Sequence, residues 1–571
     1  MKLRVLFCST LVCALALVAS QCKSRSVATT AVSEIPHLQK HGTATQLIVD
    51  GKPFLALAGE LLNNSATSVE HMRPIWAKLV EAKLNTVLAG VSWNQIEPQE
   101  GKFDFSVLDG VIQGARSHNL RLVLLWFASW KNGLSSYPPD WLKKDFQRFP
   151  RTQIAGSESL ELLSPFSDAN RDADARAFAA LMRHVKEVDR AHTVIMIQVE
   201  NEVGLRGDSR DRSPAANQAF AAPVPKELMD YLQQHKDTLI PEFRQVWQAA
   251  GFKTSGTWEE VFGKGDSKQQ IRMTDQIFMA WNFARYVGRV AEAGKAEYPI
   301  PMYMNAALYP IGKGPQLGIG DTGGQSGAPM DYLMDVWRAG APRIDMLSPD
   351  LEGVSEGRFV PFCARYTQSG NPLFIPETGA GQEPKARALY AFGRHDAIGF
   401  SPFGVDRVDR LGYDADLSAI YDIVSQLTPL ILEHQGNGTM SAVLLDPNDP
   451  PQKIQLGNYT LEVTYWPIRY KMPLIMPGEP PPGPPPPAAA LFICTGPDEY
   501  FVAGSGVKVT FSSNTPGPPK ASLGTVEEGT FVNGRWVPGI RLAGDDTGQG
   551  ADLFETQRHM GIQRFTLYRY Q

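Results

Sequence analysis

Apolar residues follow two alternating patterns over roughly the first three quarters of the chain. Short apolar runs are typical of parallel strands that are covered on both faces. They occupy Phe54–Gly59, Leu84–Val91, Leu120–Phe127, Val194–Val199, Ile300–Met304, Ile344–Leu347, Pro372–Pro376 and Ile398–Phe400. Stretches with helical spacing lie between them, at 69–83, 107–118, 173–188, 273–292 and 417–433. Eight strands separated by helices predict an α/β fold, a (β/α)8 TIM barrel, over residues 45–434.

The pattern changes after residue 435, where turn signals become frequent. Apolar runs within 459–465, 491–494, 500–511 and 531–537 are typical of antiparallel strands. The pair Asn533 and Gly534 favours a two-residue hairpin turn. We expect residues 435–571 to form a smaller all-β, sandwich-like C-terminal domain. The proline-rich run 477–487 is interpreted as a stiff loop.

The start of the chain has the pattern of an export signal. Two positive charges precede the apolar run Val5–Val18, which is too short to span a membrane. Residues 1–21 are therefore interpreted as a signal peptide. Lipid attachment at Cys22 is a second route, because the preceding residues resemble a bacterial lipobox except for Gln21. Both routes predict an exported protein, periplasmic or outer-membrane-anchored in a Gram-negative bacterium, with residues 22–44 as an N-terminal tether.

Composition and charge exclude several classes of partner. The 571 residues are 43% hydrophobic and 20% charged, which is the profile of a globular protein. The net charge of −5 gives no strong field for nucleic acid or anionic lipid, so the expected membrane contact is only the possible anchor at Cys22. Two of the five cysteines lie in the first apolar run, so a disulfide framework is not expected.

Carboxylates end two of the predicted barrel strands. The fourth strand runs directly into Glu200, Asn201 and Glu202, and the seventh into Glu377. The carboxyl ends of barrel strands meet at one mouth, so Glu202 and Glu377 would face each other there. Paired carboxylates of this kind serve glycoside hydrolysis, and retention of configuration requires about 5–5.5 Å between them.

Several motifs resemble glycoside hydrolase family 35, the β-galactosidases. The most specific is Gln198–Gly204, and Trp93–Phe105 has a pattern that families 35 and 42 share. Further segments that fit the bacterial subgroup with a C-terminal β-domain are Arg210–Ser213, Phe278–Trp281, Pro301–Ala306, Ser401–Gly404 and Pro497–Gly504. The resemblance covers nearly everything after residue 45.

The resemblance implies a retaining exo-β-galactosidase. It implies Glu202 as the acid/base, Glu377 as the nucleophile and Asn201 as a ligand of the sugar's 2-hydroxyl group. It implies galactoside substrates, with side chains of xyloglucan as the candidate, and neither a metal nor an organic cofactor. One departure concerns the pocket: Glu352 stands where related sequences tend to have Tyr.

Further substrate-binding residues are expected around the mouth. The loop after the third strand would offer Trp130 as a sugar platform, with Lys131 and Asn132 as ligands of hydroxyl groups. Asn305, at the end of the fifth strand, is similarly placed. Trp93 and Trp281 are additional candidate platforms, although single tryptophans are more often core residues. By strict alternation Glu200 would share the face of Glu202 one layer deeper, where it would pair with a buried cation and position its neighbour; direct contact with the sugar is the alternative.

Two other functions remain open. One is a different retaining exo-β-glycosidase, a β-glucosidase or β-fucosidase, because the sequence does not display the pocket for the 4-hydroxyl group. The other is a catalytically silent surface lipoprotein that binds sugar. The glycine-rich run 318–323 matches a dinucleotide-binding fingerprint, but it neither follows a predicted strand nor opens a helix, so a barrel loop is the better interpretation.

Overall fold

The computed structural model describes residues 34–264, 273–308, 325–352, 356–379, 384–407, 411–466, 487–550, 553 and 560–571. The predicted export signal with Cys22, the 318–323 run and nearly all of the proline-rich run lie outside the described residues. Within the described part of the chain, no helix is both long and apolar enough to cross a membrane.

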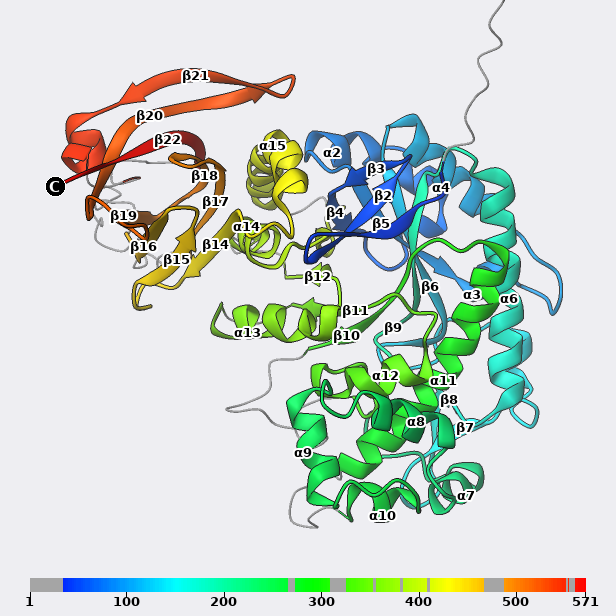
Figure 1. Ribbon diagram of the computed structural model, residues 1–571. Helices are drawn as coiled ribbons and strands as arrows, with labels where there is room; N and C mark the ends of the chain where they lie inside the picture. The colour runs from blue at the N-terminus through cyan, green and yellow to red at the C-terminus, as the bar shows by residue number, and fades with distance from the viewer. Residues whose placement is uncertain are drawn as a thin grey trace, which may run out of the picture.

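A closed barrel of eight parallel strands forms the centre of the molecule (Figure 1). Its strands are β4 (Ala56–Glu60), β5 (Thr86–Ser92), β6 (Arg121–Lys131), β9 (Val194–Asn201), β10 (Met302–Ala307), β11 (Met346–Leu351), β12 (Phe374–Thr378) and β13 (Gly399–Pro402). Each of the eight predicted apolar runs corresponds to one of these strands. Alternate residues face two different cores: Ala56 and Ala58 lie in the barrel interior, whereas Leu55 and Leu57 pack toward the helices. The predicted barrel is confirmed.

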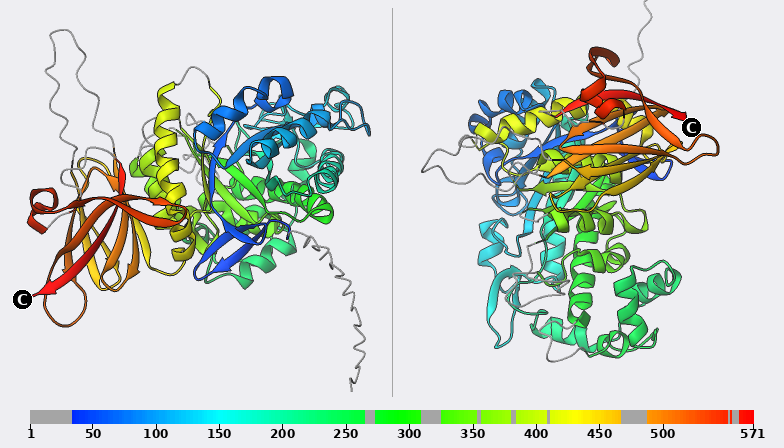
Figure 2. Two further views of the ribbon diagram at one scale, coloured as in Figure 1. Left: turned by 90° about the horizontal axis from the view of Figure 1, so that it is seen from above. Right: turned by 90° about the vertical axis from the view of Figure 1, so that its left-hand side faces the viewer.

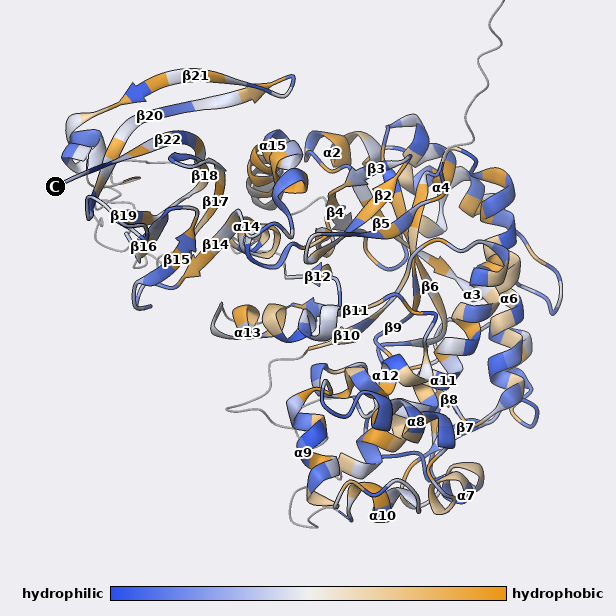
Figure 3. Ribbon diagram, viewed as in Figure 1, coloured by the Kyte–Doolittle hydropathy of each residue, from blue (hydrophilic) through white to orange (hydrophobic). Residues whose placement is uncertain are grey.

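One helix segment follows each barrel strand and covers its outer face. These helices are α2 (Ile75–Glu81), α4 (Ser106–Ser117), α6 (Asp168–Val188), α11 (Met273–Glu297), α12 (Met334–Gly340), α13 (Glu356–Tyr366), α14 (Pro384–His395) and α15 (Leu411–His434). The predicted helix over 69–83 is divided, because Pro74 separates α1 (Val69–Met72) from α2. In Figure 3 the barrel strands are largely hydrophobic, whereas the helices carry both hydrophobic and hydrophilic residues.

Shorter elements fill the connections. Four helices lie between β9 and α11 and gather beyond the barrel (Figure 1). They are α7 (Pro214–Ala221), α8 (Lys226–Gln234), α9 (Pro241–Ala249) and α10 (Trp258–Phe262). Other connections contain α3 (Trp93–Ile96), α5 (Asp140–Lys144) and the strand pair β7 (Arg151–Gln153) and β8 (Ser159–Leu163). The apolar-run pattern did not predict these elements.

A small antiparallel sheet closes the amino-terminal end of the barrel. It consists of β1 (His37–His41), β2 (Ala44–Val49) and β3 (Lys52–Phe54). Leu47 and Val49 belong to the same apolar cluster as the barrel-interior residues. The tether predicted over residues 22–44 therefore contains an ordered strand, β1, because its pairing with β2 satisfies the backbone there.

The C-terminal domain is a nine-stranded antiparallel sheet. Its strands are β14 (Met440–Leu445), β15 (Gln452–Leu456), β16 (Tyr459–Tyr465), β17 (Ala488–Gly496), β18 (Glu499–Ser505), β19 (Val507–Ser513), β20 (Lys520–Val532), β21 (Arg535–Leu542) and β22 (Gly561–Tyr570). The predicted all-β domain is confirmed, and so is the Asn533–Gly534 hairpin, which joins β20 to β21. The expected sandwich is instead one continuous hydrogen-bonded sheet, which curves around its own apolar core.

The sheet packs directly against the barrel helix α14 (Figure 2). Leu444 of β14 and Leu491 of β17 belong to the same apolar cluster as the barrel helices. The two surfaces approach closely at Gly393: a Cβ atom there would lie 2.8 Å from the Cβ of Ala442 and 2.8 Å from the Cγ of Leu491. A larger residue than glycine would separate the sheet from α14.

Candidate active site

Four carboxylates gather at the carboxyl-terminal end of the barrel. Glu60 ends β4, Glu202 directly follows β9, and Asp350 and Glu377 lie on β11 and β12. All four are buried. One carboxylate oxygen from each of Glu202, Asp350 and Glu377 lies within 4.8 Å of the other two. The barrel thus brings together the two glutamates that the sequence singled out, Glu202 and Glu377.

Asn305 of β10 connects the members of this group. Its Oδ1 accepts a hydrogen bond from the backbone N–H of Glu202 at 2.9 Å. Its Nδ2 donates to Oδ2 of Asp350 at 2.7 Å and to Oε1 of Glu377 at 3.3 Å. The side chain predicted as a sugar ligand therefore orients both candidate catalytic residues.

Lys131 and Asn201 form a second connection. Nζ of Lys131 donates to Oδ1 of Asn201 at 2.9 Å, and Nδ2 of Asn201 donates to Oε1 of Glu377 at 3.4 Å. The ammonium group of Lys131 also lies 4.7 Å from the centre of the Phe127 ring. The sequence placed Lys131 in a loop, but β6 extends to this residue and buries it.

The backbone at the end of β9 explains how consecutive residues reach different surroundings. Glu200 and Glu202 both have positive φ angles, 63° and 44°. The turn at Glu200 breaks the strand alternation, so its carboxylate points away from the mouth. There it accepts hydrogen bonds from the backbone N–H groups of Ser129 (3.3 Å) and Trp130 (2.7 Å). The predicted pairing with a buried cation is wrong, because the other neighbour of Glu200 is the carboxyl group of Asp174 on α6.

Glu200 and Asp174 form a buried carboxyl pair. Asp174 accepts hydrogen bonds from Nε1 of Trp126 at 2.9 Å and from Oγ of Ser129 at 2.5 Å. Burial and the Asp174 carboxylate raise the pKa of Glu200 well above its ordinary range, which favours one shared proton between them. The pair fixes the bulged end of β6, which carries Lys131.

Burial and mutual repulsion raise the pKa values of the mouth carboxyls. Burial first, and then the Glu377 charge, raise the pKa of Glu202 to about 8. The same two causes raise the pKa of Glu352 to about 7 and move the pKa of Asp350 well above its ordinary range. Burial opposes the charge of Lys131, but Glu377, Glu60 and the other nearby carboxylates raise its pKa overall. A charged lysine thus faces several carboxyls, some of them protonated at neutral pH.

The three tryptophans predicted as sugar platforms are buried. Trp93 and Trp130 have 0% exposure. Trp93 donates its Nε1 to Glu97 at 2.9 Å, and Trp130 packs 5.0 Å from the ring of Phe283. Trp281 lies outside the barrel, on a groove of about 880 Å³ between α6 and α11. The structure gives these rings packing positions and does not bring them to the mouth.

Asn132 and Glu352 both lie near the mouth, Asn132 partly buried beside β9 and Glu352 at the exposed rim. Asn132 directly follows Lys131 with a φ of 54°, and its backbone N–H donates to the carbonyl oxygen of Asn201 at 3.3 Å. Its Oδ1 is buried and has no partner among the described residues. Glu352 directly follows β11 and is exposed at the rim, although the surrounding protein still partly desolvates its carboxyl group, which lies within electrostatic range of Glu202 and Glu377.

The sequence analysis did not single out Glu60 or Asp350 as site residues. The sequence pattern that indicates Glu202 and Glu377 also applies to these two residues, because each lies at the carboxyl end of an apolar barrel strand.

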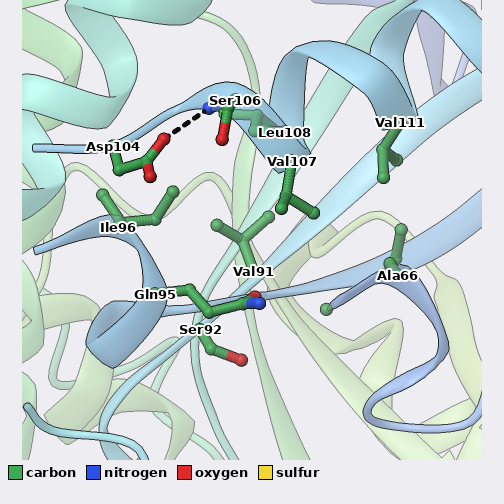
Figure 4. Close-up of a pocket in the computed structure, with 12 residues that line it drawn as sticks. Ala66, Val91, Ser92, Gln95, Ile96, Asp104, Ser106, Val107, Leu108 and Val111 are labelled. Carbon is green, nitrogen blue, oxygen red and sulfur yellow. Dashed lines mark hydrogen bonds between the residues drawn. The ribbon is translucent and has the colours of Figure 1, made fainter. Parts of the chain in front are cut away.

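A separate small pocket lies between β5 and α4 (Figure 4). Its volume is about 120 Å³, and its lining is mostly apolar, with Val91, Ile96, Val107 and Val111. The backbone N–H of Ser106 donates to Asp104 at its edge. None of the predicted site residues lines this pocket, so it is distinct from the carboxylate cluster.

Glu202, Asp350 and Glu377 have the spacing of a possible metal site. A divalent cation requires ionised oxygen ligands. Burial raises the pKa values of Glu202 and Asp350, which favours their protonated forms. The charged Lys131 also lies within electrostatic range of all three. The donor set therefore suits proton transfer better than metal binding.

Two family models match parts of the chain. Residues 64–283 match the model described as "Beta-galactosidase", of glycoside hydrolase family 42, and residues 417–554 match one described as a domain of unknown function, DUF5597. The first match includes Lys131, Asn201 and Glu202 and ends before Glu377.

Individual relatives share the β-galactosidase description. A β-galactosidase of Xanthomonas manihotis is 31% identical over 175 residues, or 29% of this chain and 26% of that protein. The chain thus aligns with about a quarter of that relative's length. Solved β-galactosidases from Rahnella sp. R3 (TM-score 0.45) and Bacillus circulans sp. alkalophilus (TM-score 0.44) are each 16% identical, covering 66% of this chain and 57% of theirs. Over residues 64–283, which contain the barrel strands β5, β6 and β9, this chain is similar to β-galactosidase glycoside hydrolases.

Proposed function

We propose that this protein is a retaining exo-β-galactosidase. The observation that carries the proposal is the approach of Glu202 and Glu377, whose carboxylate oxygens lie within 4.8 Å of each other on two different strand ends. The 4.8 Å limit applies to one oxygen from each residue. Retaining glycosidases hold their carboxyl groups about 5–5.5 Å apart, whereas inverting enzymes need about 6.5–9.5 Å to admit a water molecule. The spacing favours direct attack by one glutamate.

The surroundings of the two glutamates assign their roles. The raised pKa of Glu202, about 8, keeps its carboxyl group protonated at neutral pH, as a general acid requires. Glu377 accepts hydrogen bonds from Asn201 and Asn305, which hold a carboxylate in place for attack on the anomeric carbon. Glu202 protonates the leaving oxygen while Glu377 forms a glycosyl ester. Glu202 then takes a proton from the water that hydrolyses this ester.

Asn201 is the proposed ligand of the sugar's 2-hydroxyl group. Lys131 occupies its Oδ1, so Nδ2 is directed toward Glu377 and the anomeric centre. A contact to the 2-hydroxyl group strengthens as the transition state forms. Lys131 and Asn132 are the further proposed ligands at this side of the mouth.

The finer assignments are also proposals. The motifs around Glu202 and in the β-domain favour membership of family 35 within the wider β-galactosidase group. Galactosylated xyloglucan oligosaccharides are the proposed natural substrate. Export through the N-terminal signal, as a periplasmic protein or with a lipid anchor at Cys22, would place the enzyme where such oligosaccharides arrive.

The testing experiment uses purified mature protein and p-nitrophenyl β-glycosides of galactose, glucose and fucose. We expect the galactoside to give the highest kcat/KM. Glu377→Gln should lower kcat by at least about 1,000-fold, and proton NMR should show the β-anomer as the first product. Faster turnover of another sugar would change the proposed sugar specificity of the pocket but leave the catalytic roles of Glu202 and Glu377 unchanged. A folded protein that cleaves none of them would favour the sugar-binding lipoprotein.

A further inference from the structure

Glu60 is a buried carboxyl group that the proposed mechanism does not use. Its side chain is 1% exposed, and neither carboxylate oxygen has a hydrogen-bond partner among the described residues. A buried carboxyl group without partners destabilises the folded state, because it loses its hydration and gains nothing in exchange. Such a residue calls for a functional explanation.

The strand directs this carboxyl group into the barrel. Ala56 and Ala58 belong to the interior apolar cluster, and Glu60 is the next residue on that face of β4. Its carbonyl oxygen accepts hydrogen bonds from the N–H groups of Gly404 (2.8 Å) and Val405 (3.1 Å). The backbone is therefore fixed at this position, which keeps the Cα–Cβ bond of Glu60 directed into the barrel.

Other polar groups without partners line the same interior. The hydroxyl group of Tyr303 on β10 is fully buried and has no partner in the described residues, and neither has Oδ1 of Asp350. After burial itself, the charges of Glu60 and Asp350 most affect the pKa of the Tyr303 hydroxyl, so the three groups lie within electrostatic range of one another. Because each of these buried groups lacks a protein partner among the described residues, a bound molecule with several hydroxyl groups would supply the missing hydrogen bonds.

We propose that Glu60 is a specificity-determining residue whose carboxyl group, together with the Tyr303 hydroxyl, hydrogen-bonds hydroxyl groups of the sugar at the non-reducing end of the substrate. This inference rests on the proposed function and names the part of the substrate that the pocket recognises. Glu60 ends β4 at the same mouth of the barrel as Glu202 and Glu377, and the charges of Glu377 and Lys131 act on it, as expected of a residue beside the reacting sugar. The same contact accounts for retaining a carboxyl group that the unliganded fold does not satisfy.

The chemistry of Glu60 suits a hydroxyl ligand. Burial first, and then the Glu377 charge, raise its pKa well above the ordinary range of a glutamate. A protonated carboxyl group offers one O–H donor and one carbonyl acceptor, which matches a hydroxyl group that also donates and accepts. A sugar that lacks the matching hydroxyl group would leave Glu60 unpartnered, so the pocket would reject it.

The experiment compares Glu60→Met, which keeps the length of the side chain, with Glu60→Gln, which keeps a donor and an acceptor. Substrates are p-nitrophenyl β-galactoside and its series of monodeoxy forms. We expect Glu60→Met to lower kcat/KM for the parent by about 30- to 100-fold, but by less than about 3-fold for one particular deoxy form. Glu60→Gln should retain part of the parent activity. A uniform loss on every substrate, or no loss, would overturn the proposal.

A binding measurement separates this proposal from the proposed function. Galactose should raise the Tm of the wild-type protein, and Glu60→Met should abolish that rise while its own Tm without sugar is higher than that of the wild type. Gln563→Met is the matched control, because Gln563 is also buried with an unpartnered oxygen but lies in the β-domain. It should keep the galactose response.

The same measurement tells the two proposals apart. If the wild type binds galactose but cleaves no glycoside, the enzyme assignment fails and the Glu60 assignment stands. The Glu60 assignment would be overturned if Glu60→Met bound galactose as well as the wild type does, or if the wild type bound no sugar.

Discussion

Nζ of Lys131 and Oδ1 of Asn201 lie 2.9 Å apart, in a hydrogen bond that joins the end of β6 to the end of β9. The bond fixes which end of the Asn201 amide faces Glu377. It also brings a positive charge near Glu202, whose pKa it lowers against the opposing effects of burial and Glu377. One lysine thus influences both the geometry and the protonation of the site.

Lys131→Met removes the charge and the hydrogen bond but keeps the length of the side chain. We expect kcat/KM for the galactoside to fall by about 100-fold, because the Asn201 amide is no longer oriented. The alkaline limb of the pH–rate profile should move to higher pH, because Lys131 lowers the pKa of Glu202. This role would be contradicted if the variant, shown by circular dichroism to be folded, had nearly wild-type rates and an unchanged alkaline limb.

Glu352→Gln should move the same limb in the opposite direction. The Glu352 charge raises the pKa of Glu202, so its removal lowers that pKa and shifts the alkaline limb to lower pH. Because Glu352 is exposed at the rim, we expect the rate at the optimum to change by less than about 5-fold. Rates measured from pH 5 to 10 on both variants form a matched pair, and shifts of equal sign would disprove the electrostatic account.

Stability should fall as pH rises through the neutral range. The pKa of Glu202 is about 8 in the folded protein, against 4.5 for an ordinary glutamate, so the folded state alone holds this proton between those values. Each such proton makes the free energy of unfolding fall by about 1.4 kcal/mol per pH unit. Urea unfolding at several pH values measures the slope. Glu202→Gln should make the free energy of unfolding less dependent on pH. An unchanged slope would show that Glu202 has the same pKa in the folded and unfolded states.

The buried pair of Glu200 and Asp174 predicts a contrast between two substitutions. Glu200→Gln keeps one acceptor oxygen, which can serve the shorter of the two hydrogen bonds, from the backbone N–H of Trp130, so we expect a loss of about 1–2 kcal/mol in the free energy of unfolding. Glu200→Leu leaves both N–H groups buried without a partner and should cost about 2–5 kcal/mol. Chemical denaturation compares them. Equal losses would mean that the carboxyl pair does not support the end of β6.

Much of the fold follows from patterns of apolar residues. Barrel strands are buried on both faces, so they appear in the sequence as continuous apolar runs, and all eight were located. The inserted helices α7–α10 were missed because they are short and belong to no barrel repeat. The single sheet of the β-domain was expected as a sandwich, because strand patterns show which residues are buried but not which strands share hydrogen bonds.

The candidate site was predictable where a carboxylate directly follows an apolar strand. Glu202 and Glu377 follow apolar runs, and the closure of the barrel brings them together. The position of Glu200 was not predictable, because its positive φ angle breaks the regular alternation of side chains along a strand, and nothing in the sequence indicates that angle. Trp130 was expected in a loop, because the sequence does not show that β6 continues through a bulge and buries its ring.

Gly393 has a consequence for how the whole chain is built. With no side chain there, the sheet of the β-domain lies against α14 as the outer wall of the barrel's own core, and its leucines complete that core. A barrel cut away from the sheet would expose this apolar wall to water. The two parts should therefore melt in a single calorimetric transition, and in evolution they would be inherited together, because neither is a detachable accessory of the other.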